Sequence, residues 1–328
     1  MRAVRHSFVL MAVTGLVGCG KPDPSSAVPA NETNLAKHPN VLFEVFGERE
    51  DPRMIPLATI EDGKLQHIAF SAAHWKQFDR QYDRSGTVYT LYQDARVAGT
   101  ATVKQGMWEH PNSPLYSLPN CHLLLPLSAV SLDSKVKAGI TVEFLATSSP
   151  LAVPAADKPA PLTRDEVIQQ ARDIGIKVGT GAGIPRAQLD SLDFRGLAVN
   201  TGVSSEPTLI ASFIDPNAED HRKPSDGTSY VFTIADKIGA EYTPTFTKTV
   251  DGSKAHAEYR RYVDHIDIDG DGKDEIVLEG WHDGGDSYPI ILRFANGRWH
   301  EIFRGTPDWC LDNRGQTNNP FVDKDNAE

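Results

Sequence analysis

The alternation of hydrophobic and polar positions between residues 40 and 145 predicts a β-rich domain. Short apolar or alternating runs are separated by turns rich in glycine, aspartate and proline. The sequence DGK at residues 62–64 lies between two such runs and predicts a tight hairpin. Residues 71–82 differ, because Trp75, Phe78 and Tyr82 fall on one face at helical spacing. We therefore expect one helix among the strands of this domain.

Residues 163–312 predict a second β-rich domain that begins with one helix. Thr163, followed three residues later by Glu166, forms a capping box, and the apolar stripe after it ends at Gly175. Runs rich in Val, Ile, Tyr, Phe and Thr then alternate with turns, which favours sandwich or propeller-blade-like sheets. A degenerate β-propeller is the alternative. Asn296 and Gly297 predict a hairpin turn within this region.

Three segments lack these patterns. Residues 20–39 are polar and proline-rich, which is typical of a disordered tether. Residues 146–162 are also proline-rich, with few charges, and predict a linker between the two domains. Residues 313–328 are polar and predict a frayed tail.

The first 19 residues have the features of an export signal. Arg2, Arg5 and His6 give a positive start, and the apolar run SFVLMAVTGLV is too short to span a bilayer. The sequence LVGC at its end resembles the lipobox of bacterial lipoproteins. The resemblance implies that residues 1–19 are a signal peptide and that Cys19 carries fatty acyl chains, such as palmitate, which anchor the protein in a membrane. Gly20 after this cysteine favours the outer membrane, facing the periplasm, over the inner membrane or the cell surface.

Composition and charge narrow the possible partners. The chain has 328 residues, of which 40% are hydrophobic, so it has room for two domains with real cores. The formal net charge is -11, and lysine and arginine do not cluster. Nucleic acid is therefore excluded as a partner, since binding it requires a basic surface. The acidic charge also means that acyl chains, and not electrostatics, must hold the protein on an anionic membrane.

The segment DIDGDGKDE, residues 267–275, places carboxylates at alternating positions of a tight turn. Counted from the first aspartate, acidic side chains fall at positions 1, 3, 5 and 9, and glycines fall at 4 and 6. Oxygens spaced in this way can converge on a hard cation such as Ca²⁺, which takes about six to eight oxygen ligands. Asp274 is expected to point away into solvent. The expected ligands are the side chains of Asp267, Asp269, Asp271 and Glu275 and the main-chain carbonyl of Lys273.

The loop is not an EF-hand, because position 12 is Leu278 and both flanks have β-type sequences. It resembles the calcium loop of FG-GAP and VCBS-type repeats, in which the ligands occupy positions 1, 3, 5, 7 and 9. The resemblance covers residues 258–305 and implies the strands of one propeller blade with a structural calcium ion. An acidic turn without metal is the alternative.

Other candidate sites in the sequence are weaker. It contains no Gly-x-Ser-x-Gly elbow, no phosphate-binding glycine loop and no paired zinc-protease histidines. Cys121 and Cys310 form a disulfide or remain as two buried thiols. Trp281, Trp299 and Trp309 are expected to pack in the core or rim, with a carbohydrate-stacking surface as the alternative. A hydrolytic metal centre would use His265, Asp267, His282 and Asp283.

Together these features predict a lipid-anchored protein of the cell envelope. With an anchor, a calcium loop and no catalytic motif, we expect a non-enzymatic binding or scaffold module whose ligand is a protein or a glycan. The alternatives are a metal-dependent hydrolase of the envelope and an adhesion-type β-propeller.

Overall fold

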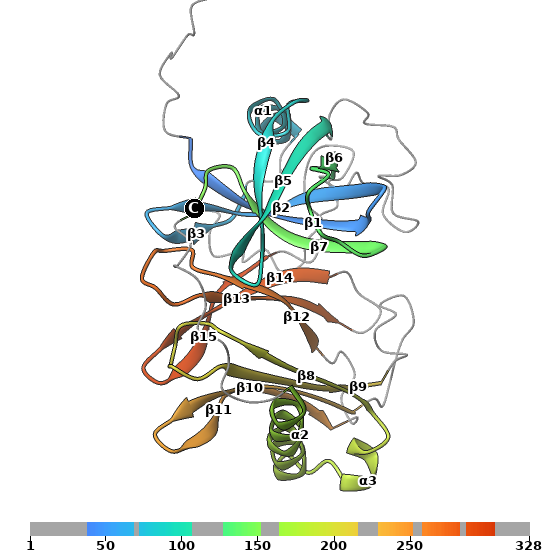
Figure 1. Cartoon of the computed structure of the whole chain (residues 1–328), viewed down its shortest axis with the longest axis vertical. Helices are drawn as coiled ribbons and strands as arrows, with labels where there is room; N and C mark the ends of the chain where they lie inside the picture. The colour runs from blue at the N-terminus through green and yellow to red at the C-terminus, as the bar shows by residue number, and fades with distance from the viewer. Residues whose placement is uncertain are drawn as a thin grey trace, which may run out of the picture. The chain divides into compact units, whose positions relative to one another are not determined.

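The computed structural model describes residues 38–68, 72–106, 127–151, 164–215, 229–251, 258–282 and 287–305 (Figure 1). The predicted signal peptide, nearly all of the tether, and the tail lie outside the described residues, as do Cys19, Cys121 and Cys310. The protein is mainly β, as its sequence predicts. No helix in the described ranges is long and apolar enough to cross a membrane.

The first half of the chain forms a closed antiparallel barrel. Six strands follow one another in the order β1-β7-β4-β5-β6-β2, and β2 pairs back with β1 to close the ring. A short strand, β3, extends β2 through the predicted turn at Asp62 and Gly63. The strands are β1 (Asn40–Glu48), β2 (Asp51–Glu61), β3 (Lys64–Gln66), β4 (Val88–Gln93), β5 (Arg96–Gln105), β6 (Ser128–Leu132) and β7 (Thr141–Thr147). The last strand extends to Thr147 and so includes the first two residues of the predicted linker.

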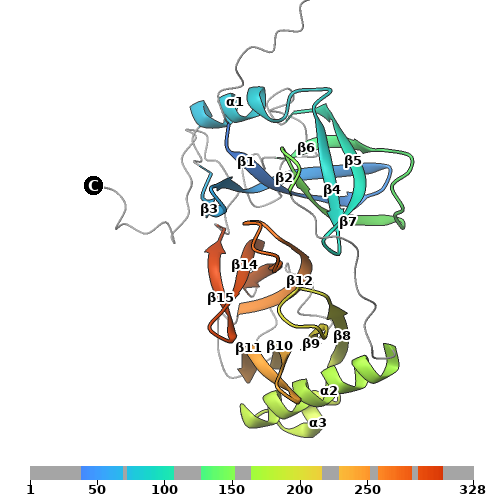
Figure 2. The same ribbon diagram turned by 60° about the vertical axis from the view of Figure 1, so that its left-hand side comes forward.

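The predicted helix of the first half is α1 (Ala72–Gln81). Phe78 and Tyr82 share a buried face, and their rings lie 4.6 Å apart. Phe78 also contacts Phe43 of β1, at 6.2 Å between ring centroids. The helix therefore packs its apolar face against the barrel core (Figures 1 and 2).

The second half of the chain forms two antiparallel sheets of four strands, with the orders β11-β10-β9-β8 and β12-β13-β14-β15. The first sheet contains β8 (Asp193–Val199), β9 (Thr208–Ile214), β10 (Ser229–Ile238) and β11 (Glu241–Asp251). The second contains β12 (Glu258–Ile266), β13 (Glu275–His282), β14 (Ser287–Ala295) and β15 (Arg298–Arg304). The second sheet spans the range expected for one blade, and the turn at Asn296 and Gly297 joins β14 to β15 as predicted.

These two sheets share one core and form a sandwich. Tyr230 of β10 meets Tyr259 of β12 edge-on at 5.3 Å, and Tyr259 stacks on Trp281 of β13 at 5.7 Å. All three rings are buried, with residues of both sheets around them. The described residues therefore contain two four-stranded meanders packed face to face, and not a ring of blades.

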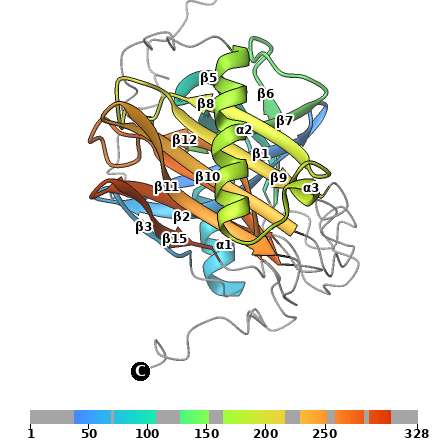
Figure 3. The same ribbon diagram turned by 90° about the horizontal axis from the view of Figure 1, so that it is seen from below.

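The long helix α2 (Arg164–Gly181) lies across the outer face of the β8–β11 sheet, followed by the short α3 (Arg186–Leu189) (Figure 3). The prediction that this helix ends at Gly175 is wrong. A Cβ at Gly175 would lie 2.6 Å from Cε2 of Phe213, so this glycine lets the helix approach the sheet closely. Thr163 of the predicted capping box lies outside the described residues.

The barrel and the β12–β15 sheet are also in contact. Ile266, Val277 and Ile291 belong to the same buried cluster as the barrel residues. At the edge of this cluster, the guanidinium of Arg261 donates two hydrogen bonds to the Glu143 carboxylate, at 2.8 and 2.6 Å. The loop between β12 and β13 therefore lies where the sandwich meets the barrel.

Candidate metal centre at the acidic loop

The acidic loop connects β12 to β13 and is curled by its own side chains. Asp267 accepts hydrogen bonds from the main-chain N–H groups of Gly270 and Gly272, at 2.7 and 2.9 Å. Asp271 accepts one from the N–H of Lys273 at 2.8 Å. Gly270 and Gly272 have φ values of 78° and 84°, which a Cβ would strain. The sequence DIDGDGKDE therefore specifies a tight turn by local interactions.

Three of the predicted ligands come together in this turn. Asp267, Asp269 and Glu275 each offer a carboxylate oxygen, and these oxygens lie within 4.8 Å of one another. Asp267 and Glu275 are buried, with 5% and 1% of their surface exposed. Asp271 and Lys273 are exposed, and Asp271 does not belong to the convergent group. The structure thus brings together the predicted positions 1, 3 and 9.

A cation that sequence reasoning missed lies beside these carboxylates. Nε of Arg293 donates to Oε1 of Glu275 at 2.6 Å, and Nη2 lies 3.0 Å from Oδ2 of Asp269. Glu275 stands opposite Arg293 because the β13–β14 register pairs Ile276 with Leu292. The register of the β13–β14 hairpin is the signal that could have revealed this arginine. Once one residue pair of an antiparallel hairpin is assigned, all the other pairs follow from it.

Arg293 also links the loop to the barrel. Its Nη2 donates to the carbonyl oxygen of Gly63, in the β2–β3 turn, at 3.2 Å. The two segments are in close contact there, because a Cβ at Gly63 would lie 2.6 Å from the Cβ of Asp269. Burial raises the pKa of Glu275 to about 7, although hydrogen bonds from the Ile268 N–H and from Arg293 oppose the shift.

The expectation that Asp274 is solvated is wrong. Only 4% of its surface is exposed, and its main-chain N–H donates to the carbonyl of Thr201 at 2.8 Å. The segment between β8 and β9 covers it, since a Cβ at Gly202 would overlap the carbonyl oxygen of Gly272. Burial, together with the charge of Asp267, raises the pKa of Asp274 to about 7.

His265 lies just before the loop and is 2% exposed. Its Nδ1 is 2.6 Å from the hydroxyl of Tyr262, and its Nε2 is 3.7 Å from Oδ2 of Asp274. Burial lowers the pKa of His265 to about 4, so the imidazole is neutral near pH 7. For the alternative hydrolytic centre, the side chains of His282 and Asp283 lie outside the described residues.

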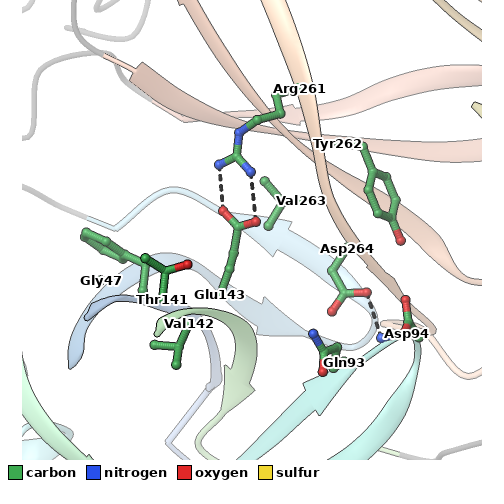
Figure 4. Close-up of a pocket in the computed structure, with 11 residues that line it drawn as sticks. Gly47, Gln93, Asp94, Thr141, Val142, Glu143, Arg261, Tyr262, Val263 and Asp264 are labelled. Carbon is green, nitrogen blue, oxygen red and sulfur yellow. Dashed lines mark hydrogen bonds and ion pairs between the residues drawn. The ribbon is translucent and has the colours of Figure 1, made fainter. Parts of the chain in front are cut away.

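A polar cavity of about 620 Å³ opens beside Asp264, the neighbour of His265 in sequence, between the barrel and β12 (Figure 4). The ion pair of Glu143 and Arg261 forms one side of it, and Asp94 and Asp264 form the other. Burial and the charge of Asp94 raise the pKa of Asp264 to about 7. Sequence reasoning did not select these residues, because they are distant along the chain.

Two of the three tryptophans considered above are core residues, as predicted. Trp281 is 2% exposed and Trp299 is 3% exposed. Nε1 of Trp299 donates to Oδ2 of Asp236 at 2.8 Å. Neither side chain can form a carbohydrate-stacking surface in this arrangement, whereas Trp309 lies outside the described residues.

Comparison with known proteins gives no relative for this chain: no family model matches it, and no curated protein and no solved structure does either. The function must therefore be argued from the residues themselves.

Proposed function

We propose that this protein is a lipid-anchored, non-enzymatic binding or scaffold module of the cell envelope with a structural calcium ion in the loop at residues 267–275. The convergence of Asp267, Asp269 and Glu275 within 4.8 Å is the observation that carries the calcium assignment. The sequence LVGC, with Cys19, carries the assignment of the anchor.

The donor set suits a hard cation. All predicted ligands are oxygens, four from carboxylates and one from the main-chain carbonyl of Lys273. Arg293 does not neutralise them, because four ionised carboxylates and one guanidinium leave a net charge of -3, and the cation pairs directly with only Asp269 and Glu275. A divalent ion would reduce this charge to -1. Calcium therefore relieves a repulsion that Arg293 relieves only in part.

A structural role follows from the position of the loop. The proposed ligands lie at the turn of the β12–β13 hairpin, and Arg293 joins the same cluster to the β2–β3 turn of the barrel. An ion bound here would hold the β12–β13 hairpin against the β2–β3 turn. An ion that binds the folded state and not the unfolded chain increases the free energy of unfolding. The nitrogens of His265, the described histidine nearest the loop in sequence, face Tyr262 and Asp274.

Removing calcium is expected to lower the melting temperature by roughly 5 °C, because an ion at about 100 times its Kd adds about 2.7 kcal/mol. Thermal unfolding with excess chelator, and again after Ca²⁺ is restored, measures this effect. Asp269→Ala should abolish the response, because Asp269 belongs to the convergent group, whereas Asp133→Ala should keep it. The control is matched, because each aspartate is exposed and accepts the N–H of the residue two positions later, at 3.1 and 2.8 Å. Equal melting temperatures of the wild type with and without calcium would refute the site.

The anchor has a separate test. Fatty-acid labelling in a bacterial host should mark the wild-type protein and leave Cys19→Ala unlabelled and outside the membrane fraction, since this thiol is the proposed acylation site. Cys121→Ala serves as the control and should retain the label. A labelled Cys19→Ala protein would contradict the proposed anchor.

A further inference from the structure

A second group of potential metal ligands lies outside the acidic loop. Asp94, Asp264 and His265 each offer one ligand atom, and these atoms lie within 4.8 Å of one another. Asp94 belongs to the β4–β5 turn of the barrel, and the other two residues lie near the end of β12 in the sandwich. We propose that these three residues bind a zinc ion between the barrel and the sandwich. The proposal does not depend on the calcium site.

The backbone places the three ligands. Asp94 and Ala95 form a turn with positive φ values of 51° and 55°, and the N–H of Asp94 donates to Oδ1 of Asp264 at 2.9 Å. A bulge between Tyr262 and Asp264 interrupts the β12–β13 register. Successive side chains of a regular strand point to opposite faces, but a bulge redirects them. Asp264 and His265 therefore approach the same point, with Oδ1 and Nδ1 3.6 Å apart.

Asp274 provides an independent indication of a ligand. This carboxylate is 4% exposed, and its Oδ1 has no hydrogen-bond partner among the described residues. Its Oδ2 faces the second nitrogen of the imidazole, at 3.7 Å from Nε2 of His265. A histidine that binds a metal through one nitrogen usually donates its other N–H to a carboxylate. Zinc on Nδ1 would fix the proton on Nε2 and direct that N–H toward Oδ2 of Asp274.

The hydroxyl of Tyr262 contacts the proposed ligand nitrogen of His265. This hydroxyl lies 2.6 Å from Nδ1 of His265, where a zinc ion would bind. The hydroxyl must move away for the ion to enter. The phenol is thus a competitor of zinc, and removing it should not weaken binding.

The chemistry of the group and its access both favour zinc. An imidazole nitrogen with two carboxylates suits a borderline metal better than calcium, which prefers oxygen ligands. Asp94, Tyr262 and Asp264 line the cavity of about 620 Å³, so an ion can enter from solvent (Figure 4). Three protein ligands would leave a fourth coordination position for a water molecule.

Calorimetric titration of the full-length protein with Zn²⁺, at saturating Ca²⁺, tests the proposal. We expect about one equivalent of zinc to bind to the wild type, and Asp94→Asn to weaken binding by about tenfold or more. Asp62→Asn is the matched control, since Asp62 is an exposed turn residue with a similar φ of 49°, and it should bind zinc as the wild type does. Asn tolerates this backbone conformation, so both variants should keep their turns.

Two further variants separate this site from its neighbours. Tyr262→Phe should bind zinc as tightly as the wild type or more tightly, and Asp269→Ala should retain zinc binding even though it loses calcium. Co²⁺ in place of Zn²⁺ gives a visible absorption band that Asp94→Asn should lose. Absence of zinc binding in the wild type, an unchanged affinity in Asp94→Asn, or loss of binding in Tyr262→Phe would each overturn the proposal.

Discussion

Glu258→Ala is expected to lower the free energy of unfolding by about 3–5 kcal/mol at pH 7, the usual effect of removing one member of a buried ion pair. Glu258 is 8% exposed and accepts hydrogen bonds from Lys248 Nζ at 2.6 Å and Tyr288 Oη at 2.5 Å. It also pairs with the guanidinium groups of Arg260 and Arg304. The truncation would leave three cations around an apolar methyl group.

The effect of Glu258→Ala should depend on pH in a defined direction. Burial alone would raise the pKa of Glu258, but hydrogen bonds from Lys248 and Tyr288 and the charge of Arg260 outweigh it and hold the pKa well below its usual range. A carboxylate with a depressed pKa stabilises the fold above its unfolded pKa of about 4.3, and this contribution is lost as the pH falls below that value. The wild type and the variant should therefore become closer in stability between about pH 5 and pH 3.

Urea unfolding of both proteins at pH 7 and at lower pH, followed by tryptophan fluorescence, measures this difference. Glu241→Ala is the control, because Glu241 is exposed at the start of β11 and should change stability by less than about 0.5 kcal/mol. Two results would contradict the role assigned to the ion network: a loss of unfolding free energy below about 1 kcal/mol in Glu258→Ala, or a stability difference from the wild type that grows in acid.

Asp236→Ala is also expected to lower the free energy of unfolding by about 3–5 kcal/mol, because several buried donors would lose the acceptor that they share. Asp236 is 1% exposed. It accepts hydrogen bonds from Thr208 Oγ1 at 2.6 Å, Thr245 Oγ1 at 2.5 Å and Trp299 Nε1 at 2.8 Å. These donors come from β9, β11 and β15, so one carboxylate links both sheets of the sandwich.

The same urea titrations check this prediction. The fluorescence of the folded protein gives a second signal, because the indole of Trp299 loses its hydrogen-bond acceptor in the variant. Asp236→Asn keeps the shape and one acceptor oxygen and should cost less than the alanine variant. Asp193→Ala, at an exposed position in β8, should behave like the wild type. Equal losses in Asp236→Asn and Asp236→Ala would show that hydrogen bonding to Trp299 and the threonines does not control stability here.

The patterns that led to correct predictions are local in the chain. The four strands of the β12–β15 sheet fall within residues 258–305, where alternation and turn residues predict them, and Asn296 and Gly297 form the expected turn. The curl of the acidic loop is equally local, since Asp267 bonds to N–H groups within five residues of itself. Such features depend on neighbours in sequence, so a single sequence is enough to predict them.

The predictions that failed concern contacts between distant segments. Gly175 has the sequence signature of a helix end, but contact with Phe213 makes it a close-packing position. Asp274 was expected in solvent, and the segment around Thr201 and Gly202 buries it. Arg293 is remote from the acidic loop along the chain and reaches it through strand register.

For this protein, the sequence alone determined the mainly β class, most turns and the positions of the loop carboxylates, because each depends on residues a few positions apart. Only the tertiary structure decided that β1 pairs with both β2 and β7 to close a barrel. It also decided that Asp94 of that barrel meets Asp264 and His265 of the sandwich. The physical reason is that hydrophobic periodicity shows which face of a segment is buried but not which distant segment covers it, and that choice is made only when the two pack together.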